Sequence, residues 1–262
     1  MNTSNKLTFY KYQGTGNDFI LLDDRNEKFP KGDTELIKLL CDRRFGIGAD
    51  GLILLQNEEH SDFKMVYFNA DGNESTMCGN GGRCIVAFAH SLGLIEQNTI
   101  FTAVDGNHHA MIDGDKVSLQ MIPIKEIIDK KKYYFLNTGS PHHVQIVTEL
   151  EQMDVAKDGA RLRYGIYGEA GSNINFVEQE TDNVFAVRTY ERGVEGETLS
   201  CGTGVTAVAL AMHKSGQTKN KEVAIKTKGG TLKVTFDYSD GVYNSIWLIG
   251  EAKLVYKGEL EH

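Results

Sequence analysis

The chain repeats part of its own sequence at a spacing of 123 residues. The pattern Cys-Gly-x-Gly occurs at Cys78 and again at Cys201, and apolar residues follow both copies. When the chain is aligned with itself at this spacing, without gaps, further identical residues match in the same order: Thr15 with Thr138, Gly48 with Gly171, Tyr67 with Tyr190 and Glu74 with Glu197. Repetition on this scale predicts two related halves, near 1–122 and 123–262.

Each half is predicted to combine many strands with an apolar helix. Alternating apolar residues predict strands at 7–13 and 18–23 around a glycine turn, followed by a helix at 34–44. The other strands are predicted at 51–57, 63–70, 98–103, 107–112 and 115–121, and in the second half at 134–137, 142–148, 172–178, 183–190, 222–227, 230–236, 243–249 and 252–257.

The helices predicted after the two cysteines, near 84–92 and 201–213, are apolar on nearly every side. A surface helix would show a polar face, so these two helices are expected inside the fold. The plentiful strands of each half would then wrap around the helix. We therefore predict an α+β protein with two similar lobes.

Composition excludes several classes of function. The net charge of −8 makes binding to nucleic acid or to an anionic membrane surface unfavourable. No apolar run is long enough to span a membrane, and the first residues lack the apolar core of a signal peptide. We therefore expect a cytoplasmic protein with four free thiols. Residues 260–262 are interpreted as the remnant of an expression tag.

A cysteine that precedes a glycine-rich helix start is suited to acid–base chemistry. The first N–H groups of a helix have no partner within the helix, and they favour a bound carboxylate and a thiolate. Two such helix ends, facing each other across a pseudo-twofold axis, could hold one carboxylate with a thiol on each face of the neighbouring carbon. That arrangement suits inversion of a stereocentre, so Cys78 and Cys201 are the candidate catalytic residues. Cys41 and Cys84 are expected to be buried and inert.

At these motifs the sequence resembles the diaminopimelate epimerase family. The matching segments cover about four fifths of the chain, in the family's order: GTGNDFILLD (14–23), DRRFGIGADGLI (42–53), FNADGNESTMCGNGGRC (68–84), GSPHHV (139–144), SNINF (172–176) and ERGVEGETLSCGTG (191–204). The resemblance implies an enzyme that interconverts LL- and meso-diaminopimelate without pyridoxal phosphate, metal or other cofactor, in lysine and peptidoglycan precursor synthesis. It also implies a homodimer with no nucleic-acid partner.

The resemblance further implies two barrel-like, mostly antiparallel sheets, each around a central helix. The last strand, near 250–259, would pack back on the 1–122 lobe, which leaves 123–249 as the second lobe. Cys78 and Cys201 would be the acid–base pair, and His142 and Glu191 would tune the pKa values of the thiols. The implied substrate-binding residues are Asn17, Asn69, Gly79, Asn80, Ser140, Asn173, Glu191, Arg192, Gly202 and Thr203.

The chain departs from the family pattern at two candidate positions. Ser140 stands where many members have an asparagine, and a serine hydroxyl reaches less far. Gly51 stands where some members have a glutamine, so it offers no side chain. One additional residue lies between Arg192 and Cys201, in a predicted loop.

Two other interpretations remain open. The chain could be a different two-cysteine racemase on the same scaffold, although the pair Glu191-Arg192 suits a substrate with a second amino-acid end. It could also be a binding protein without activity, which would not need the thiols.

The GxGxxG match at 46–51 does not follow a strand and open a helix, so it does not predict a dinucleotide site. The histidine pairs at 108–109 and 142–143 lack the spacing of a zinc site.

Overall fold

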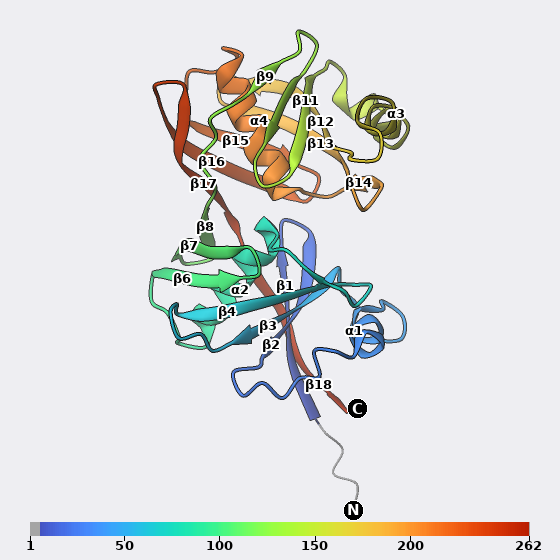
Figure 1. Cartoon of the computed structure of the whole chain (residues 1–262), viewed down its shortest axis with the longest axis vertical. Coiled ribbons are helices and arrows are strands. Elements are labelled where there is room, and N and C mark those ends of the chain that lie inside the picture. Colours follow the sequence, from blue (N-terminus) through green and yellow to red (C-terminus); the bar gives the residue numbers. More distant parts are fainter. Residues whose placement is uncertain (1–5, 262) are drawn as a thin grey trace, which may run out of the picture. The chain divides into compact units, whose positions relative to one another are not determined.

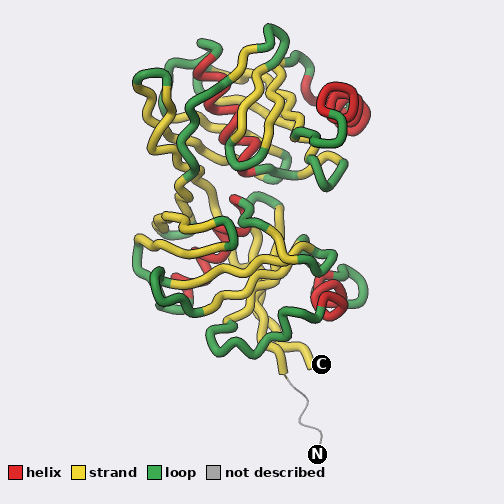
Figure 2. Tube along the Cα trace, viewed as in Figure 1, coloured by secondary structure: helices red, strands yellow, loops and turns green. Residues whose placement is uncertain are grey.

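The computed structural model describes residues 6–261 and shows a mixed α/β fold that consists mostly of strands (Figures 1 and 2). The chain forms two compact units. One contains the described residues up to Leu119 together with those from Glu251 onward, and the other is Gln120–Gly250. The α+β class inferred from the sequence is confirmed, with a buried helix in each unit.

The first unit is a sheet around a central helix. Its strands are β1 (Lys6–Gly14), β2 (Asn17–Asp23), β3 (Gly51–Gln56), β4 (Phe63–Asn69), β5 (Glu74–Ser75), β6 (Asn98–Ala103), β7 (Gly106–Asp113), β8 (Lys116–Gln120) and β18 (Lys253–Glu261). They pair in the order β18-β1-β2-β3-β4-β6-β7-β8, with β5 on β4. Only β2–β3 and β4–β6 of these pairs are parallel. The helices are α1 (Thr34–Cys41) and α2 (Gly79–Ser91).

The second unit repeats this order of elements. Its strands are β9 (Ile128–Asp129), β10 (Tyr134–Asn137), β11 (Pro141–Ile146), β12 (Asn173–Thr181), β13 (Val184–Glu191), β14 (Gly196–Thr198), β15 (Glu222–Thr227), β16 (Gly230–Ser239) and β17 (Val242–Glu251). They pair in the order β9-β10-β11-β12-β13-β15-β16-β17, with β14 on β13. The helices are η1 (Leu150–Gln152), α3 (Val155–Tyr167) and α4 (Gly202–Lys214).

The repeat found in the sequence is therefore a repeat of structure. A shift of 123 residues carries the bounds of α2 onto those of α4 to within a residue at each end. The parallel pair β11–β12 likewise corresponds to β2–β3, and β13–β15 corresponds to β4–β6.

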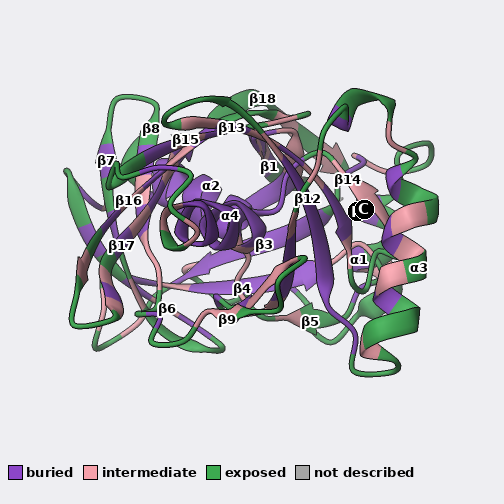
Figure 3. Cartoon of the chain, turned by 90° about the horizontal axis from the view of Figure 1, so that it is seen from above, coloured by how far each residue is buried: buried purple, intermediate pink, exposed green. Residues whose placement is uncertain are grey.

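The helices α2 and α4 are central because their side chains are mostly small or apolar, with Arg83 of α2 as a buried exception. Every residue of α2 from Gly79 to Ala89 is buried, and so is almost all of α4 up to Met212 (Figure 3). In the second unit, Val208 and Leu210 pack with Phe185 and Leu248 of the surrounding strands. The outer helices α1 and α3 are each capped by an aspartate, Asp33 or Asp154, and bury only one face.

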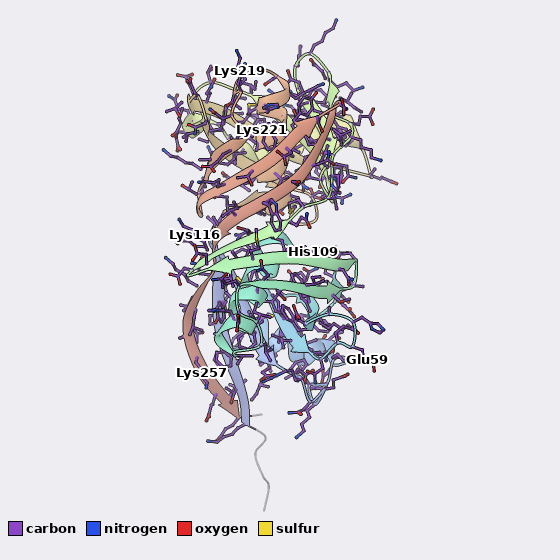
Figure 4. All side chains as sticks on the ribbon, turned by 90° about the vertical axis from the view of Figure 1, so that its left-hand side faces the viewer. Glu59, His109, Lys116, Lys219, Lys221 and Lys257 are labelled. Carbon is purple, nitrogen blue, oxygen red and sulfur yellow. The ribbon has the colours of Figure 1, made fainter. Side chains whose placement is uncertain are left out.

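Many charged side chains point outward, as the labelled Glu59, Lys116, Lys219, Lys221 and Lys257 illustrate (Figure 4). No helix within the described residues is long and apolar enough to cross a membrane. Residues 6–261 also contain no cluster of three histidine, cysteine, aspartate or glutamate side chains that could hold a metal ion.

Some predicted element bounds were wrong. Helix α2 begins at Gly79 rather than near Cys84, and α1 ends at Cys41 rather than at residue 44. Leu260 and Glu261, interpreted as a tag remnant, continue β18 and pair with Leu7 and Lys6. His262 lies outside the described residues.

Candidate active site

Cys78 is the N-cap residue of α2. Its backbone is extended, and the N–H of Gly81 donates a hydrogen bond of 3.2 Å to the sulfur. A side chain at position 81 would stand 3.2 Å from the same sulfur and from Ile53, so glycine keeps the space beside the thiol open. The thiol therefore lies at the positive end of the helix, where negative charge is favoured.

Cys201 is the N-cap residue of α4 and repeats this placement, but its surroundings differ. Its residue exposure is 6%, and its sulfur lies 3.5 Å from the hydroxyl oxygen of Thr203. Burial, followed by the charge of the Glu191 carboxylate, raises the pKa of the Cys201 thiol well above its usual value. Cys201 is consequently held as a neutral thiol.

His142 connects β11 to the start of α4. The ring is fully buried, with its Nε2 atom 2.9 Å from the Thr203 hydroxyl and its Nδ1 atom 3.2 Å from the amide nitrogen of Asn175. Burial and the positive charge of Arg192 lower the pKa of His142 to about 3. The neutral ring accepts at Nδ1 from Asn175, so its proton lies on Nε2 and is donated to Thr203.

Asn175 is itself fixed in orientation. Its amide oxygen accepts from the Thr189 hydroxyl at 3.0 Å, and its amide nitrogen also donates to the backbone oxygen of His143 at 2.9 Å. Both ends of the amide are therefore assigned, and the hydrogen bonds from Asn175 to His142 and from His142 to Thr203 have one direction.

Asn173, Ser140 and Arg192 form a second cluster in the same unit. The oxygen of Asn173 accepts from the backbone N–H of Arg192 at 2.8 Å, and its nitrogen donates to Ser140 at 3.3 Å. The same amide nitrogen lies 3.5 Å from Nε2 of His142, at the outer limit for a hydrogen bond. Arg192 donates to the backbone oxygen of Ala170 at 2.9 Å and reaches the Ser140 hydroxyl at 3.5 Å. The shorter Ser140 side chain is thus part of this cluster.

In the first unit, Asn17 and Asn80 meet beside Cys78. Asn80 donates to the side-chain oxygen of Asn17 at 3.3 Å, and Asn17 donates to Asp50 at 2.5 Å. Asn80 in turn accepts from the guanidinium of Arg83 at 3.0 Å. Both asparagines are therefore oriented by charged groups, Asp50 at one end and Arg83 at the other.

The remaining candidates are placed by the backbone. Asn69 is the last residue of β4 and lies opposite Gly51 on β3. A side chain at Gly51 would stand 2.5 Å from the backbone oxygen of Phe68 and 3.1 Å from the Tyr67 hydroxyl. Tyr67 thus fills the space that a longer residue at position 51 would need. Gly79 and Gly202 are the first residues of α2 and α4.

The structure brings together candidates within each unit: Asn17, Cys78, Gly79 and Asn80 in the first, and Ser140, His142, Asn173, Glu191, Arg192, Cys201, Gly202 and Thr203 in the second. Sequence analysis missed Arg83 and Asn175. Arg83 is a charged residue on an otherwise apolar helix, which is a signal that could have been noticed. His143 is buried and stacks on Tyr133 with ring centroids 4.0 Å apart.

Comparison with known proteins identifies the family of the chain. The family model described as "Diaminopimelate epimerase" matches residues 9–121 and 134–255. A diaminopimelate epimerase of Flavobacterium psychrophilum is 56% identical over 253 residues, which cover 96% of this chain and 99% of the relative. One of Chlorobaculum tepidum is 41% identical over 258 residues, with 94% and 98% covered.

The chain belongs to the diaminopimelate epimerase family. The resemblance drawn from the motifs is confirmed, and the protein is an isomerase. Diaminopimelate epimerases share their fold with other proteins. A phenazine biosynthesis protein of Bacillus anthracis aligns with a TM-score of 0.77 at 14% identity, over 98% of this chain and 100% of its own. A hydroxyproline epimerase of Agrobacterium vitis aligns with a TM-score of 0.71 at 14% identity, over 100% and 94%.

Proposed function

We propose that the protein interconverts LL-diaminopimelate and meso-diaminopimelate, with Cys78 and Cys201 as the acid–base pair. One thiolate removes the α-proton and becomes a thiol. The other thiol delivers its proton to the opposite face of the carbon and becomes a thiolate. No net oxidation or reduction occurs, and each face of the stereocentre has one acid–base group.

The observation that carries this proposal is the matched position of the two cysteines. Each is the N-cap of the buried helix of its unit, and each precedes a glycine in the first helical position. The first N–H groups of these helices have no partner within the helix and can donate to the carboxylate next to the reacting carbon, with Gly79, Asn80, Gly202 and Thr203 supplying backbone donors. Fixed donors of this kind also stabilise the negative charge that develops when the α-proton leaves.

The distal amino-acid end of the substrate is assigned to the polar cluster of the second unit. Arg192 provides a guanidinium fork for a carboxylate, and Asn173 and Ser140 lie within hydrogen-bond reach of it or its backbone. The Glu191 carboxylate can accept from an ammonium group. Asn17 and Asn69 are proposed as further substrate contacts from the first unit.

His142 and Glu191 are proposed to tune the thiols. Glu191 favours the protonated form of Cys201 through its negative charge. His142 donates to Thr203 at 2.9 Å, and this leaves the Thr203 hydroxyl free to donate to the Cys201 sulfur at 3.5 Å. The two groups thus favour different protonation states of one thiol, which a reversible acid–base residue requires.

A different two-cysteine racemase is the alternative, because the fold also occurs in a probable proline racemase of Agrobacterium radiobacter, with a TM-score of 0.68 at 16% identity over 97% of this chain and 92% of its own. Arg192 and Glu191 favour diaminopimelate, since a substrate with one amino-acid end leaves them without a role.

We also propose that the enzyme needs no pyridoxal phosphate, because the two thiols supply both acid and base. We expect it to act as a homodimer in the cytoplasm, where its thiols stay reduced.

The test is conversion of LL-diaminopimelate by the purified protein without added pyridoxal phosphate. Wild type should produce the meso isomer, and Cys78→Ala and Cys201→Ala should each lose about 1,000-fold in kcat, as expected for the loss of a general acid or base. Cys41→Ala is the matched control, because burial raises the pKa of Cys41 to about 12 and makes it unreactive. Inversion of proline but not of diaminopimelate would favour the alternative racemase, and full activity in either alanine variant would refute the two-thiol mechanism.

A further inference from the structure

Within residues 6–261, Arg83 is a buried cation without a carboxylate partner. It is the fifth residue of α2 and is 0% exposed. Its hydrogen bonds go to neutral oxygens: the Gly79 carbonyl at 3.2 Å, the Thr15 hydroxyl at 2.7 Å and the Asn80 amide at 3.0 Å. Its Nε atom is buried and has no hydrogen-bond partner in the described structure.

This placement is energetically unfavourable by itself. A buried charge is costly unless it is paired, and a cation near a helix N-terminus also opposes the helix dipole. Burial lowers the pKa of Arg83 to about 10, and the charges that act against this effect are those of the Cys84 and Cys78 thiolates. The guanidinium is therefore still protonated at neutral pH and raises the positive potential at the start of α2.

Of the two thiols, only Cys78 is placed to be the anion. Burial raises the pKa of Cys84 far above its usual value, whereas the Cys78 sulfur accepts the Gly81 N–H at the helix start. A thiolate at Cys78 would give the Arg83 cation the negative charge that its surroundings lack.

The repeat breaks at this point. A shift of 123 residues places Thr206 of α4 at the position of Arg83, and its hydroxyl donates only to the Gly202 carbonyl, at 3.1 Å. The same shift pairs Glu191, whose charge acts on Cys201, with Phe68. The unit of Cys78 has thus gained a buried cation, and the unit of Cys201 has gained a carboxylate beside the thiol.

We propose that Arg83 is the counter-charge of a Cys78 thiolate, so that the free enzyme rests with Cys78 as the base and Cys201 as the acid. The assignment of base and acid rests on the proposed function, whereas the charge state of Cys78 can be measured without substrate. Arg83 acts through Cys78 and is a positioning residue.

Two of the other charged groups on the elements packed against α2 have partners of opposite charge. Asp18 of β2 pairs with Lys11 of β1 at 2.7 Å and with Arg43 at 2.6 Å. His108 of β7 contacts Asp105 at 3.1 Å. β3 contributes no ionisable side chain. The remaining ionisable residues on these elements, on α2 itself and on neighbouring β4 are Lys6, Tyr10, Tyr12, Asp23, Lys64, Tyr67, Cys84, His90, His109, Asp113, Lys253, Tyr256, Lys257, Glu259 and Glu261.

The test is the pH dependence of iodoacetamide alkylation of the folded, full-length protein, resolved for each cysteine by mass spectrometry. In wild type, the midpoint for Cys78 should lie at least one pH unit below that for Cys201. Arg83→Gln removes the charge and should raise the Cys78 midpoint by about one to three pH units. Alkylation at pH 7 should then slow about threefold or more, because less of the Cys78 thiol is ionised; the higher nucleophilicity of the remaining thiolate offsets only part of this loss.

Two further variants separate charge from shape. Arg83→Lys keeps the cation and should keep the Cys78 midpoint near that of wild type. Thr206→Val, at the equivalent position of α4, should leave it unchanged. The proposal is overturned if Cys201 has the lower midpoint in wild type, if folded Arg83→Gln keeps the wild-type midpoint, or if Arg83→Lys shifts it as far as Arg83→Gln does. If Arg83→Gln does not fold, the wild-type order of midpoints decides. The alkylation midpoints are measured without substrate. A negative epimerase assay would therefore refute the proposed function without refuting the role of Arg83.

Discussion

The Nε2 atom of His142 lies 2.9 Å from the hydroxyl oxygen of Thr203, whose hydroxyl in turn lies 3.5 Å from the Cys201 sulfur. Because Asn175 donates to the opposite ring nitrogen, the proton of the neutral imidazole points toward Thr203. A side chain on the neighbouring strand β12 thereby determines how a hydroxyl at the start of α4 faces the thiol.

Replacing Asn175 with leucine should slow the reaction without weakening substrate binding. The substitution removes the donor that fixes the tautomer of His142, so the Thr203 hydroxyl loses its defined orientation toward Cys201. We expect kcat to fall about tenfold, equivalent to about 1.4 kcal/mol, with KM changed less than threefold. Steady-state kinetics measure this, with circular dichroism as the folding control. An unchanged kcat in folded Asn175→Leu would show that the tautomer has no influence on the thiol.

Arg192→Lys should weaken binding of the substrate. A lysine keeps the charge but cannot form two parallel hydrogen bonds with a carboxylate. We expect kcat/KM to fall about 10- to 100-fold, mainly through KM, as for the loss of a hydrogen bond to a charged group. Arg161→Lys, on the exposed side of α3, is the control and should behave as wild type. An unaltered KM for Arg192→Lys would place the distal carboxylate elsewhere.

His142 should make the protein less stable at acid pH. Burial holds its folded-state pKa at about 3, below the ~6.5 of an unfolded histidine. The unfolded chain therefore binds a proton that the folded chain does not, and stability present above pH ~6.5 is lost as the pH falls toward 3. His142→Gln should reduce the slope of unfolding free energy between pH 6.5 and 4, by up to about 1.4 kcal/mol per pH unit. Urea titrations at several pH values measure this slope.

The control for that series is His109→Gln, because His109 is exposed on β7 (Figure 4). The unfolding free energy of His109→Gln should change with pH as steeply as that of wild type. An equal reduction in both variants would mean that burial of His142 is not the cause.

Two glycines of α3 should respond in opposite ways to alanine. A side chain at Gly159 would stand 2.4 Å from the Cβ atom of Tyr190, whereas nothing lies within 4 Å of one at Gly165. Gly159→Ala should destabilise the protein by about 1–3 kcal/mol through overpacking. Gly165→Ala should stabilise it by about 0.5–1 kcal/mol, because alanine favours a helix. Thermal unfolding measures both, and similar Tm values for the two variants would contradict the packing of α3 on β13.

Much of the fold could be predicted from local pattern and from the repeat. The alternation of apolar residues located most strands, and the apolar stretches after Cys78 and Cys201 located the central helices. The sequence did not indicate that α2 begins at Gly79, because a glycine-rich first turn looks like a loop by propensity. Helix α3 was missed for a similar reason, since Gly159 and Gly165 interrupt a polar pattern.

The candidate residues could be named, but their interactions could not. Asn175 reaches His142 only because β11 and β12 pair in parallel with Val144 opposite Asn175. The contacts of Arg83 with Thr15 and Asn80 could be found only once α2 lay inside the sheet. Such contacts depend on strand pairing between distant segments, which local sequence does not encode.

The central claim is that protons leave and arrive on opposite faces of one carbon. The most direct measurement is incorporation of deuterium at the α-carbon, with LL-diaminopimelate as substrate in deuterium oxide and samples taken at low conversion. The account predicts that the meso product carries solvent deuterium at the inverted carbon, whereas the recovered LL substrate remains unlabelled. Deuterium appearing in the LL substrate as fast as in the product, or a product that retains the original proton, would contradict it.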